Sequence, residues 1–170
     1  MPTSNKSQVI VPITEDHARI PFFRTIGLKT LLIQEQCPTS ENCFDDTEKV
    51  VPLDQIQALL AKRDKRAPRS SVDALLCSAC GKALKLVLLD AKFGCKNVKQ
   101  ITKTDFDNKL RESKGIISTD ITFHHYSYLL FKSSVLTQAH LHRLRQQFCN
   151  KPSYRFVTAR DFRKEFERLA

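Results

Sequence analysis

The sequence predicts a mixed α/β fold in which one central β-sheet is flanked by helices. Residues 72–76 and 83–93 are two apolar runs joined by a short turn segment, which is typical of a β-hairpin. Residues 121–131 are rich in aromatic and β-branched side chains and predict a further strand. Segments with apolar side chains at helical spacing lie before, between and after these strands, so we expect helices to cover the sheet.

The chain of 170 residues is long enough to build one domain around its own hydrophobic core. We expect residues 1–12 to form an N-terminal tail with a short extended piece at residues 9–11, and residues 13–170 to form a single domain. The polar start lacks the apolar stretch of a secretory signal, and no apolar run has the length of a membrane span. The expected location is therefore the cytoplasm, with no membrane as partner.

Two helices are expected before the hairpin. Thr14, followed by the acidic Glu15, has the character of a helix start, and Pro21 should interrupt that helix. Residues 53–60 carry apolar side chains at helical spacing and run into the basic segment 62–66.

After the hairpin, the pattern alternates between helix and strand. The expected elements are a helix at residues 104–113 capped by Thr104, the strand at residues 121–131, a helix capped by Ser134, a strand at residues 154–157, and a C-terminal helix with Phe162, Phe166 and Leu169 on one face.

The charge balance points to a polyanionic partner. The chain carries 28 Lys and Arg against 18 Asp and Glu, a formal charge of +10. Neutralising phosphates releases condensed counterions, so nucleic acid is the first expected partner and an anionic membrane surface the second candidate. A generic solvated cationic surface is the alternative. The side chains expected to contact phosphates are Lys62, Arg63, Lys65, Arg66, Lys96, Lys99 and Lys103.

Cysteine spacing predicts a small structural zinc site. The segment from Cys77 to Cys80, followed by Gly81, has the form of a zinc knuckle, in which a tight turn directs two thiolates at one ion. Cys37 and Cys43 lie in a polar loop that could supply two more ligands. The alternative is that Cys77 packs on its strand as a small apolar residue.

Charged residues at one end of the hairpin suggest hydrolytic chemistry. Asp90 and Lys92 project from the same face of a strand that is otherwise apolar, and Asp73 lies at the same end of the neighbouring strand. Two converging carboxylates repel each other unless a cation lies between them, and Mg²⁺ or Mn²⁺ accepts such oxygen ligands. An adjacent lysine can position an attacking water while the metal stabilises charge on a phosphate.

Asp73 followed after a turn by Asp90-Ala91-Lys92 resembles the PD-(D/E)XK nuclease superfamily, although Val72 stands where its pattern has proline. The resemblance spans residues 13–131, and the flanking text is similar to an uncharacterised bacterial family of nuclease-like domains. The matching segments are Ser71-Val72-Asp73-Ala74-Leu75-Leu76-Cys77, Leu86-Val87-Leu88-Leu89-Asp90, Lys109-Leu110 and Lys114-Gly115-Ile116.

The resemblance implies a restriction-endonuclease-like fold and an Mg²⁺-dependent endonuclease that hydrolyses phosphodiester bonds of DNA. It implies that Asp73 and Asp90 bind the metal and that Lys92 positions the water. Glu15 matches the acidic residue that an earlier helix donates in such domains.

Two alternatives belong to other functional classes. One is a non-catalytic, zinc-containing nucleic-acid-binding module. The other is a protein-interaction module of mobile-element or phage origin, in which the positive charge is incidental. A second copy of the chain or an accessory protein is a further candidate partner.

Overall fold

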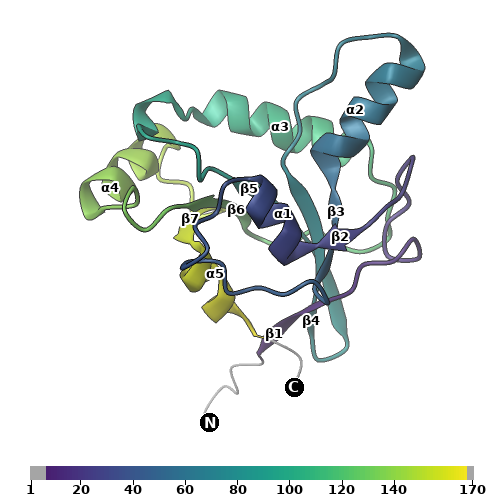
Figure 1. The fold of residues 1–170 in the computed structure, drawn as a ribbon, viewed down its shortest axis with the longest axis horizontal. Coiled ribbons are helices and arrows are strands. Elements are labelled where there is room, and N and C mark those ends of the chain that lie inside the picture. Colours follow the sequence, from purple (N-terminus) through teal and green to yellow (C-terminus); the bar gives the residue numbers. More distant parts are fainter. Residues whose placement is uncertain (1–6, 168–170) are drawn as a thin grey trace.

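The computed structural model describes residues 7–167. All strands in this part of the chain join one mixed open β-sheet that is flanked by helices (Figure 1). The strands are β1 (Gln8–Val11), β2 (Ile26–Gly27), β3 (Lys49–Pro52), β4 (Ala74–Cys80), β5 (Ala83–Ala91), β6 (Ser127–Phe131), β7 (Tyr154–Thr158) and β8 (Phe166–Glu167). The helices are α1 (Leu28–Gln34), α2 (Leu53–Asp64), the 3₁₀ turn η1 (Val98–Gln100), α3 (Lys103–Gly115), α4 (Gln138–Gln147) and α5 (Ala159–Glu165). None of these helices is both long and apolar enough to cross a bilayer. The predicted mixed α/β class is confirmed.

The sheet order is β2-β3-β4-β5-β6-β7, antiparallel as far as β5 and parallel from β5 to β7. The parallel pairs follow from the helices α3 and α4, which carry the chain back to the start of the next strand. The end of β4 that lies beyond β3 pairs with β1, and β8 pairs with β1 in turn. The predicted N-terminal tail spans residues 1–12, of which residues 1–6 lie outside the described residues. Most of the remaining tail residues form β1 and belong to the sheet.

The predicted hairpin is formed by β4 and β5, with shifted boundaries. The strands pair from Ala74 opposite Leu89 to Cys80 opposite Ala83. Only Gly81 and Lys82 form the turn, and the φ of +62° at Gly81 is in the left-handed region that favours glycine. The cysteine segment expected in the turn is therefore part of the strand.

Each face of the sheet has its own hydrophobic cluster. Side chains of α2, α3 and α4 pack on one face against Leu75 and Leu88, and those of α1 and α5 pack on the other face against Leu76 and Val87. The alternation follows from the period of two along a strand. Figure 1 shows α2 and α3 together along one side of the sheet. Fully burying a large apolar side chain stabilises the fold by about 1.5–3 kcal/mol, so both clusters hold the central strands in place.

Two expectations for the N-terminal half and the centre are wrong in detail. Residues 15–17 form a turn and not a helix. The N–H of His17 donates to the carbonyl of Thr14 at 3.0 Å, which closes a single turn, and Arg19 then pairs with Ser118 in an isolated β-bridge. The long strand expected at residues 121–131 is reduced to β6.

The later helices begin at other caps than expected. Thr102, not Thr104, caps α3 by accepting a hydrogen bond from the N–H of Asp105 at 3.2 Å. Thr137, not Ser134, caps α4. The last helix, α5, ends before Phe166, which belongs to β8, and Leu169 lies outside the described residues.

Candidate active site

Asp73 and Asp90 lie side by side at one end of the hairpin. Because Ala74 pairs with Leu89, the register places the two aspartates opposite each other. One carboxylate oxygen of Asp73 accepts a hydrogen bond from the N–H of Ala91 at 2.6 Å. Asp73 is 8% exposed and Asp90 is fully buried. The structure thus brings together the two carboxylates that the sequence singles out.

Two lysines neutralise the buried Asp90. The ammonium of Lys92 lies 2.7 Å from one oxygen of Asp90, and that of Lys109, from α3, lies 3.2 and 3.3 Å from its two oxygens. The N–H of Lys92 also donates to the carbonyl of Leu130 at 2.7 Å, which extends the pairing of β5 with β6 and fixes this lysine. A buried carboxylate is tolerated when it is paired and hydrogen-bonded in this way. Lys109 has a place in the site that sequence analysis did not assign to it.

Two further carboxylates complete the site. Oxygens of Glu35, Asp54 and Asp73 lie within 4.8 Å of one another. Glu35 directly follows α1, and Asp54 lies in the first turn of α2. Sequence analysis missed both residues, because an acidic residue in the first turn of a helix is ordinary and the residue after a short helix carries no special signal.

Hydrogen bonds between elements explain why these carboxylates meet. The N–H of Leu53 donates to the carbonyl of Asp73 at 3.0 Å, so α2 begins beside the start of β4. The amide of Gln55 donates to that of Gln34 at 3.2 Å, which joins the start of α2 to the end of α1. On the other side, the hydroxyl of Ser113 on α3 accepts from the N–H of Val72 at 2.9 Å.

Crowding of these groups shifts their proton affinities. Burial, followed by repulsion from Asp90, raises the pKa of Asp73 to about 8. Burial and neighbouring aspartates also raise the pKa of Glu35, and burial raises that of Asp54. Burial alone would lower the pKa of Lys92, but attraction and a hydrogen bond to Asp90 outweigh it and hold this pKa above its usual value. Lys92 is therefore a cation at neutral pH, suited to donate hydrogen bonds and not to accept a proton.

The donor set fits a hard divalent cation. Four carboxylates face two ammonium groups, so the fully ionised cluster carries two uncompensated negative charges. Opposite ligands of Mg²⁺ are about 4.2 Å apart, so the 4.8 Å span needs only small side-chain movements. The grouping differs from the expected pair of ligands: Asp73 is grouped with Glu35 and Asp54, whereas the oxygens of Asp90 are held by lysines.

The structure does not place Glu15 with this cluster. Glu15 is exposed in the turn at residues 15–17, and the group of potential metal ligands within residues 7–167 contains Glu35 and Asp54 instead.

The structure does not support the predicted zinc site. Cys77 is fully buried in the cluster on the α2 side of the sheet, and Cys37 is buried in the cluster on the α1 side. Burial raises the pKa of Cys77 to about 11 and that of Cys37 to about 12, which keeps both as thiols. The thiol of Cys43 donates to the carbonyl of Ala159, and Cys80 ends β4 beside the turn. No potential metal-ligand group found in residues 7–167 contains a cysteine.

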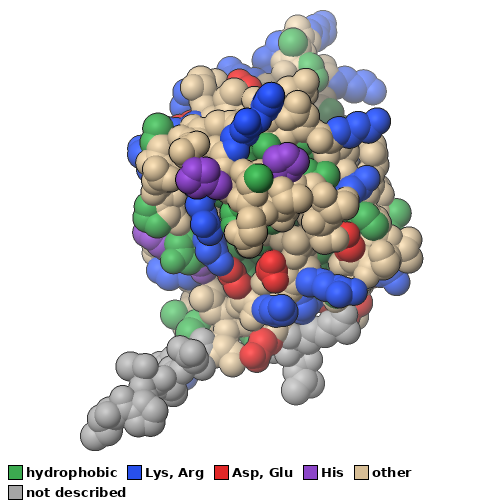
Figure 2. All heavy atoms as spheres, turned by 90° about the vertical axis from the view of Figure 1, so that its left-hand side faces the viewer, with side chains coloured by type: hydrophobic (Ala, Val, Ile, Leu, Met, Phe, Trp, Pro, Cys, Tyr) green, Lys and Arg blue, Asp and Glu red, His purple; other side chains and the backbone are tan. Residues whose placement is uncertain are grey.

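The basic residues expected to contact phosphates lie in two regions. Lys62, Arg63, Lys65 and Arg66 lie at the C-terminal end of α2, where Asp64 pairs with both arginines, and Lys96, Lys99 and Lys103 lie between β5 and the start of α3. Lys103 pairs with Asp107 at 2.5 Å, whereas Lys96 and Lys99 are exposed. Figure 2 shows further Lys and Arg side chains spread over the face on the left of Figure 1, where α4 lies. The positive charge is therefore distributed over several surfaces.

Comparison with models of protein families, with curated proteins and with solved structures finds no match to this chain.

Proposed function

We propose that the chain is a divalent-metal-dependent nuclease of restriction-endonuclease-like fold that hydrolyses phosphodiester bonds of DNA. The observation that carries the proposal is the convergence of Glu35, Asp54 and Asp73 beside the buried Asp90 and its partner Lys92. The resemblance of the sequence to PD-(D/E)XK nucleases points to the same end of the hairpin, which supports the proposal. The net charge of +10 supports a polyanionic substrate.

Each group has a role that its environment supports. The oxygens of Glu35, Asp54 and Asp73 would hold Mg²⁺ or Mn²⁺. The bound ion would supply positive charge where negative charge develops on the phosphate. Lys92, as a cation fixed by Asp90, would donate a hydrogen bond to the attacking water or to a phosphate oxygen.

A cleavage assay tests the proposal. Single-stranded, double-stranded and branched DNA, with RNA for comparison, would be incubated with Mg²⁺, with Mn²⁺ and with chelator. We expect cleavage that requires the metal and is lost in Asp73→Asn. The matched control is Asp120→Asn, because Asp120 is exposed and outside the acidic group. Metal-dependent binding without any cleavage would favour the non-catalytic nucleic-acid-binding alternative instead.

A further inference from the structure

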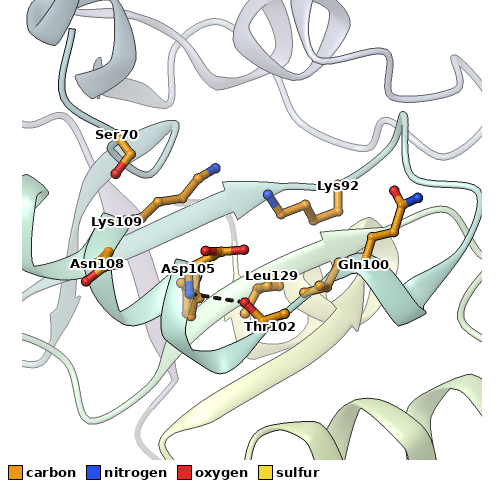
Figure 3. A pocket seen from close by; sticks show the side chains of 10 residues that line it. Ser70, Lys92, Gln100, Thr102, Asp105, Asn108, Lys109 and Leu129 are labelled. Atoms are coloured by element: carbon orange, nitrogen blue, oxygen red, sulfur yellow. Dashed lines mark hydrogen bonds between the residues drawn. The ribbon is translucent and has the colours of Figure 1, made fainter. Parts of the chain in front are cut away.

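A cavity of about 330 Å³ opens beside the two lysines of the site (Figure 3). Its apolar part is formed by Ile101, Phe106 and Leu129, which are buried. The volume is at the lower end of the range of about 300–1,000 Å³ for small-ligand pockets, which suits one small planar group better than an extended chain. Phe106 is 2% exposed and its ring packs against Phe148 and Tyr154, so it forms part of the floor of the cavity.

Polar groups lie around this apolar surface. The amide of Asn108, from α3, and that of Gln100, from η1, lie on opposite sides of the cavity in the view of Figure 3. A side-chain amide offers both a donor and an acceptor, which is the combination that the edge of a nucleobase requires. The two amides are uncharged, but the carboxylate of Asp105 also lines the cavity, so the site favours a polar ring whose edge carries amino donors.

The lysines connect the cavity to the acidic cluster. Lys92 and Lys109 line the cavity, and Figure 3 shows their ammonium groups directed toward each other. Both also contact Asp90. An ammonium has three donor hydrogens, so each lysine keeps donors for a second anion such as a phosphate.

We propose that this cavity receives the base of the nucleotide next to the cleaved bond, while Lys92 and Lys109 hold its phosphate. The inference rests on the proposed function, because the lysines belong to both sites. A base can enter such a cavity only when it is unpaired or turned out of its stack. The substrate class is therefore DNA with unpaired bases, either single-stranded or locally open.

Mononucleotides test this inference without any cleavage, because they contain no phosphodiester bond. Binding of the four deoxynucleoside 5′-monophosphates and of 2-deoxyribose 5-phosphate would be measured by NMR titration or calorimetry with Mg²⁺ present. We expect the base to strengthen binding by roughly tenfold or more over the sugar phosphate, the size of effect that burial of the base and contacts to its edge supply.

One variant closes the mouth of the cavity. Ser70 is exposed in the loop before β4 and lines the cavity, so Ser70→Trp should fill the entrance without disturbing the core. The matched control is Ala67→Trp, on the same loop and outside the lining. Ser70→Trp should remove the base-dependent gain and leave binding of the sugar phosphate unchanged, and Ala67→Trp should retain both. Gln100→Ala, on an exposed side chain, should alter the preference among the four nucleotides.

The outcomes separate this inference from the proposed function. Equal binding of nucleotides and sugar phosphate, or a base-dependent gain that survives Ser70→Trp, would overturn the base pocket even if the protein cleaves DNA. A base-dependent gain that Ser70→Trp removes would support the pocket even if no DNA is cleaved, and the nuclease proposal alone would then fail.

Discussion

Asp73→Asn is expected to stabilise the metal-free protein while it removes metal binding. The protonated carboxyl of Asp73 can donate to Asp90 and accept from the N–H of Ala91. The amide that replaces it has the same shape, one donor group and one acceptor, so it reproduces both contacts without a charge. The variant therefore mimics the neutral form that burial favours.

The magnitude follows from the raised pKa. In the unfolded chain this carboxyl titrates near 3.8, and in the folded protein near 8. Because the folded pKa is the higher one, the contribution of Asp73 to stability is greatest below pH ~4 and is lost as the pH rises through ~8. At about 1.4 kcal/mol per pKa unit, the penalty at pH 7 is on the order of 4 kcal/mol at most. For a chain of this length, about 2–4 °C per kcal/mol gives a rise in Tm of at most about 8–16 °C.

Thermal melts in chelator between pH 5 and 8.5 measure this effect. The gain in Tm of Asp73→Asn over the native protein should grow with pH, and Asp120→Asn should show no such trend. With Mg²⁺ at about 100 times its Kd the difference in Tm should narrow, because the ion then stabilises the native protein by about 2.7 kcal/mol and the variant by less. A variant that melts lower than the native protein at pH 8 in chelator would refute the reasoning, as would equal stabilisation of both proteins by Mg²⁺.

Three further predictions concern the other residues. Lys92→Ala should lower the cleavage rate by roughly 100-fold or more and weaken DNA binding only by the one phosphate contact that it removes. It should also lower the Tm, because Asp90 loses one partner. Full activity would move the chemistry to another site. The double variant Lys62→Glu, Lys65→Glu should weaken DNA binding and reduce the slope of log Kd against log salt concentration by about two. An unchanged slope would show that this end of α2 makes no phosphate contacts. Elemental analysis should find no stoichiometric zinc, and chelation in the absence of other metals should leave the Tm unchanged; one zinc per chain would contradict the packing role of Cys77.

The sequence pattern predicts the central hairpin because its information is local. Two apolar runs with a glycine between them allow few other structures, and the period of two places Asp90 with Leu88 on one face. The convergence of Asp73 with Asp90 follows from antiparallel pairing alone. Glu35 and Asp54 could not be found in this way, since their positions depend on how α1 and α2 dock against β4.

The zinc site predicted from the cysteine spacing is not supported, because that prediction also depends on contacts between separate elements. Cys77 and Cys80 have the spacing of a knuckle, but the two-residue turn at Gly81 leaves both cysteines in the strand. Side chains three positions apart on a strand point to opposite faces, so they cannot direct two thiolates at one ion. Whether a short motif lies in a turn or in a strand is decided by the strands that pair with it, here the hairpin partner β5 and the distant strand β1.

The pairing of β8 with β1 matters for engineering the protein. These two strands, the first and the last of the described residues, pair with each other, and β1 lies along β4 at Cys77 to Ala79. From Cys77, opposite the end of β1, back to Asp73 is about 13 Å at 3.3 Å per strand residue, and β8 pairs with the other end of β1, so both strands lie outside the acidic cluster. A fluorophore or a fused domain attached next to either strand should leave the cluster accessible.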